Sequence, residues 1–272
     1  MDPSLYQQII ETEMIPFLAG CRVIRTAYGR LILHPAFTIL HDANLFIVDR
    51  LPQGVDLGDL EALVRPIFRR EGVTHLRFVA PRSPMLDRLR PALMERKYLR
   101  SVYMVMVHRL RSTSNEPDSA LTIKKVDGPV GHAVLDLIED ELMREIPMEG
   151  RLIRAALRSR RREITEHSPI QWYWSEAEGV PAGSLGVLRM GPVVSIQAVA
   201  TRPSFRKRHI ATTMLCRSIR EARESGAHVA SLLVEEDNPA IALYSRLGFE
   251  TEGCIESFIL DEDDELEGVK MD

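Results

Sequence analysis

The segment from residue 193 to residue 249 constrains the fold of this chain more than any other part of it. It begins with an apolar run at 193–199, followed by a turn with Pro203 and a basic cluster at 206–208. An amphipathic stretch of helical period comes next, then a second apolar run at 229–234 and a short capped helix. Strand, helix, strand and helix in this order predict a parallel crossover within an α/β domain.

The basic turn at 206–208 offers a site for an anion. The first amide groups of a helix have no intrahelical acceptors, so a basic loop that opens a helix can hold a phosphate or pyrophosphate. This pattern suggests a nucleotide or a coenzyme as ligand. The alternative is a solvated basic turn without a ligand, because a short motif is only a hypothesis.

Two short motifs in this segment resemble those of a known family. The stretch from Arg206 to Ala211 is similar to the R/Q-x-x-G-x-G/A signature through which the GNAT superfamily of N-acetyltransferases binds acetyl-CoA. The following motif of that family, N-x-x-A-x-x-x-Y-x-x-x-G-F in loose form, is matched approximately, since its alanine stands four residues after the asparagine. The matching residues are Asn238, Ala242, Tyr244, Leu247, Gly248 and Phe249, with Ala240 nearby. Both motifs occur in the family's order, which implies a mixed central sheet flanked by helices.

One residue departs from the family pattern. His209 stands where the family usually has its first glycine, whose missing side chain lets backbone amides approach the pyrophosphate. The imidazole either leans outward and adds positive charge, or it obstructs the coenzyme. The sequence leaves both alternatives open.

The resemblance also implies which residues contact the coenzyme. Backbone groups of the strand before the signature would hold the pantetheine arm and polarise the thioester carbonyl, while the loop and the start of the helix would hold the pyrophosphate. The expected coenzyme-binding residues are Ala198, Val199, Thr201, Arg206, Lys207, Arg208, His209, Ile210, Ala211, Thr212 and Asn238.

Acetyl transfer to an amine requires a neutral amine, a stabilised oxyanion and protonation of the departing thiolate. The resemblance assigns the proton-donor role to Tyr244, and plain helix packing is the alternative. The strand 193–201 carries no carboxylate, although some relatives have a glutamate there. Glu235 and Glu236, acting through a water chain, are therefore the candidate bases, unless they are solvated acids at a strand end. Cys216 lies inside a helix, which argues against a covalent acyl-enzyme.

Composition restricts the class of protein. The chain has 272 residues, of which 45% are hydrophobic and 27% charged, with a formal net charge of -4 and a pI near 6.1. These values are typical of a globular protein and argue against a nucleic-acid binder. Its three cysteines lack metal-ligand spacing, so we expect a reducing compartment and no metal. No apolar stretch approaches the roughly 20 residues of a membrane span, and the acidic N-terminus is unlike a secretion signal, so cytoplasm is the default expectation.

The first half of the chain parallels the second in its later elements. Both halves contain glycine, strand, helix and strand in the same order, which suggests a degenerate internal duplication. The first copy lacks the basic signature, and its loop carries Asp49 and Asp56, which would repel phosphate. We therefore expect one coenzyme site, with a GNAT-like N-terminal domain at 1–112, a linker near 111–119 and the acetyltransferase domain at 119–272. The elements expected before the linker are a helix at 4–18, a strand meander at 22–48, a helix at 57–71, a strand at 75–80, a helix at 85–99 that is kinked or begun by Pro91, and a strand at 101–110.

Three further features allow two interpretations each. The arginine-rich helix at 151–167 is either a site for the coenzyme's 3′-phosphate or an acidic partner, or a solvated face compensated by the acids that precede it. Trp172 and Trp174 face the core or line an acceptor pocket. The acidic end at 260–272 attracts a cationic amine or simply solubilises the chain.

The sequence as a whole favours an α/β (α+β) fold with a GNAT-like mixed central sheet and a second, degenerate N-terminal lobe. The expected function is an acetyl-CoA-dependent N-acyltransferase, in which an amine attacks directly within a ternary complex. A small-molecule amine or a protein amino group is the expected acceptor, with no nucleic-acid or membrane partner and an open oligomeric state. The alternatives are a non-catalytic acyl-CoA sensor and a protein-interaction scaffold.

Overall fold

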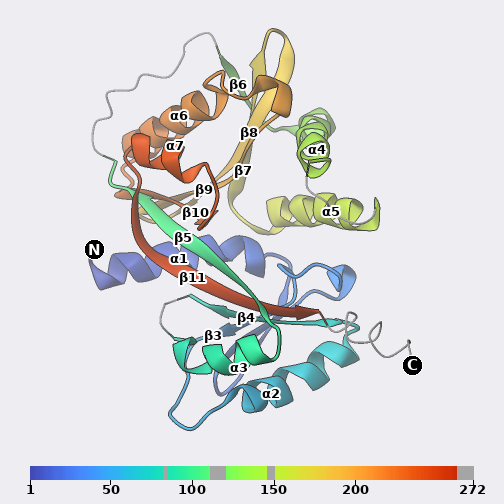
Figure 1. The fold of residues 1–272 in the computed structure, drawn as a ribbon. Helices are drawn as coiled ribbons and strands as arrows, with labels where there is room; N and C mark the ends of the chain where they lie inside the picture. The colour runs from blue at the N-terminus through green and yellow to red at the C-terminus, as the bar shows by residue number, and fades with distance from the viewer. Residues whose placement is uncertain (82–84, 111–120, 146–150, 262–272) are drawn as a thin grey trace. The chain divides into compact units, whose positions relative to one another are not determined.

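The computed structural model describes residues 1–81, 85–110, 121–145 and 151–261 (Figure 1). The fold is mixed α/β, as the sequence predicted. The chain forms two compact units: unit 1 comprises Met1–Ile15 and Val105–Glu252, and unit 2 comprises Pro16–Met104 and Gly253–Asp272. Within the described residues, no helix is both long enough and apolar enough to cross a bilayer.

Unit 2 contains a sheet with the strand order β1-β2-β3-β4-β11. Neighbouring strands are antiparallel except for β3 and β4, which are parallel. Helix α2 packs on β4, and the buried rings of Phe46, Phe78, Tyr98 and Phe258 lie in the core. The elements of the first part of the chain are α1 (Pro3–Leu18), β1 (Arg22–Arg25), β2 (Gly29–Leu33), η1 (Pro35–Phe37), β3 (Leu45–Val48), α2 (Leu57–Arg70), β4 (His75–Ala80), η2 (Asp87–Leu89), α3 (Arg90–Glu95) and β5 (Leu99–His108).

Unit 1 contains a sheet with the strand order β5-β10-β9-β8-β7-β6. Strands β9 and β10 are parallel, while β6 to β9 are antiparallel to their neighbours. The elements of the later part of the chain are β6 (Thr122–Lys125), α4 (Gly128–Met143), α5 (Arg151–His167), β7 (Ile170–Ala177), β8 (Val180–Met190), β9 (Val193–Thr201), η3 (Pro203–Phe205), α6 (Ile210–Glu224), β10 (Val229–Glu235), α7 (Ile241–Arg246) and β11 (Glu250–Asp261).

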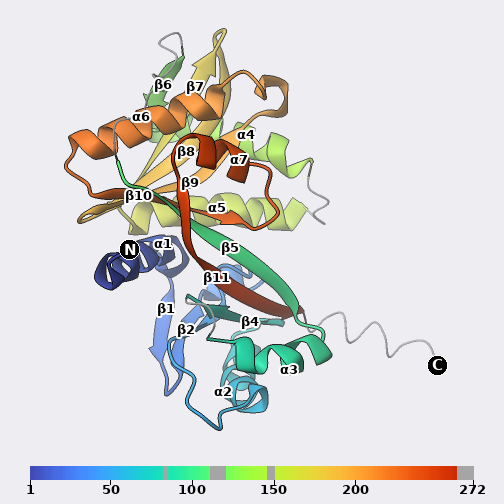
Figure 2. The ribbon, with the colours of Figure 1, turned by 60° about the vertical axis from the view of Figure 1, so that its left-hand side comes forward.

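Helices cover both faces of the unit 1 sheet. Helix α6 packs against β8, β9 and β10, whereas α4 packs against β8 and β9 and α5 against β7. Figures 1 and 2 both show α6 on one side of this sheet and α4 and α5 on the other. Trp172 of β7 is buried with Leu135 and Leu188, while its indole Nε1 donates to Thr165 Oγ1 at 2.9 Å. Trp172 is therefore a core residue, and Trp174 packs against the same cluster.

The compact units differ from the division that we predicted at 1–112 and 119–272. Residues 1–15 belong to unit 1, and the chain from Gly253 belongs to unit 2. Strands β5 and β11 each contribute residues to both units, because the division falls inside them. The predicted linker at 111–119 lies outside the described residues, as does most of the acidic end, and the proposed duplication stays a prediction.

Several predicted boundaries were wrong. Residues 37–40 form no strand, because the chain turns there after η1, and Asn44 holds that turn by accepting from His34 N at 2.9 Å. The helix expected at 85–99 is reduced to η2 and α3, but the alternative that Pro91 marks the start of a helix is confirmed, because Pro91 lies in the first turn of α3.

Candidate functional site

The site predicted in unit 1 lies where two parallel strands separate. Strands β9 and β10 pair from Val193 and Val229 to Ser195 and Ser231, and the described pairing ends there, although both strands continue. The carboxyl ends of adjacent parallel strands meet at one edge of a sheet, which is where ligands bind in open α/β folds. The end of β9 and the segments that follow β9 and β10 carry the predicted coenzyme-binding and proton-donor residues.

A β-bulge interrupts β9 just beyond the last residue that pairs with β10. Residues 184 and 186 of β8 lie opposite residues 200 and 197 of β9, so β9 has one extra residue here. Ala198 has a φ of 46°. A bulge leaves a backbone group outside the ladder and re-aims it. The predicted backbone role of Ala198 and Val199 therefore falls on residues outside the regular pairing, whereas Thr201 pairs with Gly183 of β8.

The basic loop uses the left-handed backbone conformation that a glycine would adopt. Lys207 and His209 have φ values of 61° and 59°. This region costs a residue with a side chain about 1–2 kcal/mol. His209 occupies the N-cap position of α6, and its side chain is exposed. The residue that replaces the family's glycine thus keeps the glycine-like backbone and directs its imidazole toward solvent.

The amide groups at the start of α6 are open. Thr213 N is the first amide of this region with a described acceptor, the carbonyl oxygen of His209 at 2.9 Å. Across the described residues, the backbone N–H groups of 207–212 have no protein acceptor. Such amides and the helix dipole favour an anion at this end of α6. The predicted residues Ile210, Ala211 and Thr212 form the first turn of the helix.

The arginines around this loop are held by carboxylates from other elements. Arg206 Nη2 donates to Glu145 Oε2 at 2.5 Å, and Arg208 pairs with Glu178. Lys207 is exposed. Because exposed ion pairs of this kind contribute only about 0–1 kcal/mol, a phosphate can replace them at little cost.

Tyr244 lies in helix α7, and its side chain is only 7% exposed. Burial raises the pKa of its hydroxyl above the ordinary 10.0, so the group stays protonated at neutral pH. The sequence predicts a capped helix here; it begins at Ile241 with Ala240 at its N-cap position, so Asn238 is not the N-cap. Instead, Asn238 Oδ1 accepts from Ala240 N at 2.9 Å and stabilises the turn before α7. Gly248 ends the helix with a φ of 92°.

The predicted bases lie at the surface. Glu235 is the last residue of β10 and Glu236 follows it, and both are exposed. Cys216 is buried inside α6, and burial raises the pKa of its thiol, which makes it a poor nucleophile.

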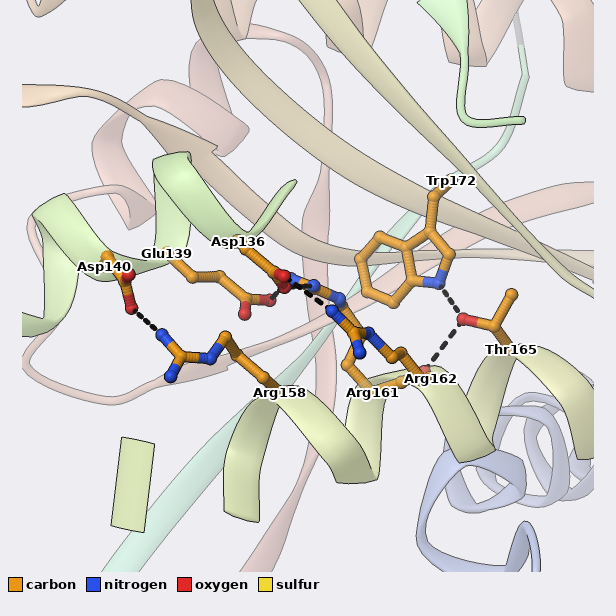
Figure 3. Close-up of polar contacts among 8 residues, drawn as sticks. All are labelled: Asp136, Glu139, Asp140, Arg158, Arg161, Arg162, Thr165 and Trp172. Carbon is orange, nitrogen blue, oxygen red and sulfur yellow. Dashed lines mark hydrogen bonds and ion pairs between the residues drawn. The ribbon is translucent and has the colours of Figure 1, made fainter. Parts of the chain in front are cut away.

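The arginine-rich helix α5 is paired with α4 (Figure 3). Arg158 Nη1 donates to Asp140 Oδ1 at 2.6 Å, while Arg161 pairs with Asp136 and with Glu139. The prediction of a solvated arginine face was wrong for Arg160 and Arg161, which are each 5% exposed. The second interpretation, compensation by the preceding acids, is the one that the structure supports.

A carboxyl group that the sequence reasoning missed lies beside β9 and β10. Glu13 of α1 is 0% exposed. Its Oε1 accepts from Ser231 Oγ at 2.5 Å, and its Oε2 accepts from Gln197 Nε2 at 2.8 Å. A sequence signal existed, because Glu13 stands four residues after Ile9 and four before Phe17, on the apolar stripe of an amphipathic helix.

In unit 2, the acidic loop that precedes α2 leads to a helix start whose described amides are capped. Asp56 is the N-cap of α2, and its Oδ1 accepts from Asp59 N at 2.9 Å, while Asp59 Oδ2 accepts from Asp56 N at 3.0 Å. Asp49 is paired with Arg30. A capped helix start with an acidic side chain disfavours a phosphate.

Unit 2 also contains the single group of potential metal ligands found among the described residues, His41, His75 and Asp261. His41 Nε2 pairs with Asp261 Oδ1 at 2.9 Å, and His75 Nε2 lies 2.9 Å from the carbonyl oxygen of Asn44. Burial lowers the pKa of His75 to about 4, which keeps this ring neutral. Protein partners account for these contacts, so we assign no ion to the group.

Comparison with known proteins identifies the domain. The model of the acetyltransferase (GNAT) family matches residues 132–249. No curated protein matches the sequence. Among solved structures, a conserved protein of unknown function from Staphylococcus epidermidis is similar with a TM-score of 0.73 and 12% identity, over 89% of this chain and 95% of that one.

Two further solved structures cover almost the whole chain. A GCN5-related N-acetyltransferase from Kribbella flavida is similar with a TM-score of 0.63 and 15% identity, over 93% of this chain and 95% of that one. A tandem GNAT protein from the clavulanic acid biosynthesis pathway has a TM-score of 0.57 and 17% identity, over 96% of both chains. At these identities the likeness concerns the fold alone. Residues 132–249 of this chain therefore match the acetyltransferase (GNAT) family in sequence, and the chain shares its fold with solved GNAT structures.

Proposed function

We propose that this protein is an acetyl-CoA-dependent N-acyltransferase. The observation that carries this proposal is the open start of α6, where the amides of 207–212 have no acceptor among the described residues. It follows directly on β9, at the edge where β9 and β10 have separated. Amides and lysine suit a pyrophosphate, and the separated strands suit an extended pantetheine arm.

The bulge in β9 supports a contact with the reacting thioester. Residues 198 and 199 lie outside the regular ladder, so their backbone groups are free to bind the arm. A backbone N–H aimed at the thioester carbonyl would stabilise the oxyanion of the tetrahedral intermediate.

The chemistry that we propose is direct attack by an amine on acetyl-CoA. The acceptor ammonium first loses a proton, and its nitrogen then forms a bond to the thioester carbon. When the carbon–sulfur bond breaks, Tyr244 donates its proton to the departing thiolate, and the second proton lost by the nitrogen restores the tyrosine. The protonated state of Tyr244, favoured by its burial, suits this donor role.

The proposal includes both small-molecule amines and protein amino groups as acceptors of the acetyl group. Glu235 and Glu236 stay candidates for receiving the ammonium proton through water, at the exposed end of β10. In unit 2, the capped start of α2 supports our expectation of a single coenzyme site per chain.

The test separates binding from transfer. Calorimetry with acetyl-CoA measures binding, and a thiol reagent measures release of free CoA in the presence of a panel of primary amines. We expect binding and amine-dependent thiol release. Binding of acetyl-CoA without thiol release in the presence of any amine would favour a non-catalytic acyl-CoA sensor. The absence of binding would favour a protein-interaction scaffold.

A further inference from the structure

Glu13 is an acid buried without a cationic partner. Its side chain is 0% exposed, and both oxygens accept hydrogen bonds from neutral side chains, Ser231 Oγ at 2.5 Å and Gln197 Nε2 at 2.8 Å. Gln197 Nε2 also donates to Ser195 Oγ at 2.5 Å. Within the described part of the chain, no lysine, arginine or histidine pairs with Glu13. Buried acids are normally paired, so this arrangement calls for an explanation.

The cluster lies at the point where β9 and β10 separate. Ser195 and Ser231 are the last residues that pair between the two strands, and Gln197 is two residues further along β9. Glu13 therefore forms hydrogen bonds with side chains of both strands close to the point where the pairing of β9 and β10 ends. Gln197 is partly exposed, so the cluster extends from the last paired residues toward solvent.

The side chains of this cluster lie on the face of the sheet that α4 covers. Ser195 lies opposite Leu188 of β8, and Leu188 is buried with Leu135 of α4 and Ile15 of α1. Residues 195 and 197 share a face because side chains alternate along a strand. Helix α6, whose amide groups we assign to the pyrophosphate, packs on the other side (Figure 2). The carboxyl group of Glu13 thus approaches the separated strands from the side opposite the helix that holds the coenzyme.

Acetyl transfer needs a group to receive a proton, and β9 carries no carboxylate of its own. We propose that Glu13 of α1 supplies this missing carboxyl group and accepts the proton that the acceptor ammonium loses before attack. The inference rests on the acetyl-transfer function proposed above. Glu13 acts through Ser231 or a water molecule, and we describe it as a positioning and proton-accepting residue.

The proton balance of this step is simple. The Ser231 hydroxyl, which is itself 0% exposed, passes its proton to Glu13 Oε1 and takes one from a water molecule that has received it from the ammonium. Glu13 becomes a neutral carboxylic acid, Ser231 is unchanged, and the amine is left with its lone pair. After transfer, Glu13 returns the proton to solvent, which matches the net release of one proton when an ammonium is acetylated.

The surroundings of Glu13 suit a proton acceptor near neutral pH. Burial raises its pKa from 4.5 to about 7, while hydrogen bonds from Ser231, Ser195 and Gln197 act in the opposite direction. These three neutral side chains of β9 and β10 are the groups that act on it besides burial. A base whose pKa is close to the working pH is half ionised there, which is the condition for efficient general base catalysis.

The deciding experiment compares the pH dependence of acetyl transfer in the wild-type protein, Glu13→Gln, Ser231→Ala and Glu11→Gln. Glutamine has the shape of glutamate but takes up no proton in this range. Glu11 is an exposed acid on the same helix and serves as the matched control. Circular dichroism and calorimetry with acetyl-CoA establish that each variant is folded and binds the coenzyme.

We expect kcat/KM of the wild-type protein to rise with pH through about pH 7. Glu13→Gln should lower it by roughly 10²-fold or more and abolish this rise, with little change in acetyl-CoA affinity. Ser231→Ala removes the hydroxyl that relays the proton and a hydrogen bond that lowers the pKa of Glu13, so kcat/KM should fall and its rise should move to higher pH. Glu11→Gln should behave as wild type.

A Glu13→Gln variant that keeps the wild-type rate and pH profile would overturn the inference while leaving acetyl transfer intact. A wild-type protein that releases no thiol with any amine would overturn acetyl transfer itself, and the role of Glu13 with it. A Glu13→Gln variant that loses acetyl-CoA binding and kcat/KM in parallel, with an unchanged profile shape, would show a purely structural role and also refute the proposal.

Discussion

Glu13→Gln should also change how the stability of the protein depends on pH. The folded-state pKa of Glu13 is raised to about 7 from 4.5, so the folded chain holds a proton that the unfolded chain releases. The stability contributed by the protonated carboxyl is fully present below pH 4.5 and is lost as pH rises through about 7. Each tenfold change in proton affinity is worth about 1.4 kcal/mol, so this interval corresponds to about 3 kcal/mol.

Urea unfolding, followed by circular dichroism from about pH 4.5 to 8, measures this effect. The free energy of unfolding of the wild-type protein, minus that of Glu13→Gln, should fall by about 3 kcal/mol across this range. Taking the difference cancels the titration of every group that the two proteins share. Glu11→Gln, on the exposed face of the same helix, should follow the wild type at every pH. Parallel curves for the wild type and Glu13→Gln would refute the reasoning, because Glu13 would then titrate alike in both states.

Three further changes test other parts of the account. Tyr244→Phe should lower kcat by roughly 10²-fold at unchanged acetyl-CoA affinity, because only the proton donor is lost; an unchanged kcat with rate-limiting chemistry would remove that role. His209→Gly should raise the melting temperature through a gain of about 1 kcal/mol, since φ is 59° there; a lower melting temperature is the opposing result. Arg161→Ala should cost about 3 kcal/mol in urea unfolding, because it leaves Glu139 without its partner. The exposed Arg162→Ala should cost at most about 1 kcal/mol, and equal small losses in both would contradict this.

The local parts of the fold were predictable from the sequence. The apolar runs and helical period of residues 193–249 correspond to β9, α6, β10 and α7 in the expected order. Gly248 ends α7 with a φ of 92°, and an alanine methyl would lie 3.1 Å from His108 Nε2. Such features depend on neighbouring residues, so their sequence signals are direct.

The long-range parts were not predictable. The two compact units share β5 and β11, and nothing in the sequence of a strand identifies the partner beside which it lies. Arg161 was expected at the surface, because its acidic partners on α4 come into reach only after α4 and α5 have packed. The role of His209 depended on its backbone conformation, since only an αL residue can replace the glycine there.

Glu13 has both a local feature that the sequence reveals and long-range contacts that it does not. An acid on the apolar stripe of an amphipathic helix is a visible anomaly, because burial of an unpaired charge is costly. Its partners Gln197 and Ser231 lie 184 and 218 positions away in the chain, so the sequence showed the anomaly without the site that explains it.

The central claim is that the start of α6 binds the pyrophosphate of acetyl-CoA, and calorimetric titration of the intact chain tests it most directly. We predict saturable binding of one acetyl-CoA per chain, weakened by added salt and accompanied by a higher melting temperature. At a ligand concentration 100 times the Kd, the gain in stability should be about 2.7 kcal/mol. No heat and no rise in melting temperature at millimolar ligand would contradict it, and two acetyl-CoA molecules per chain would contradict the single site.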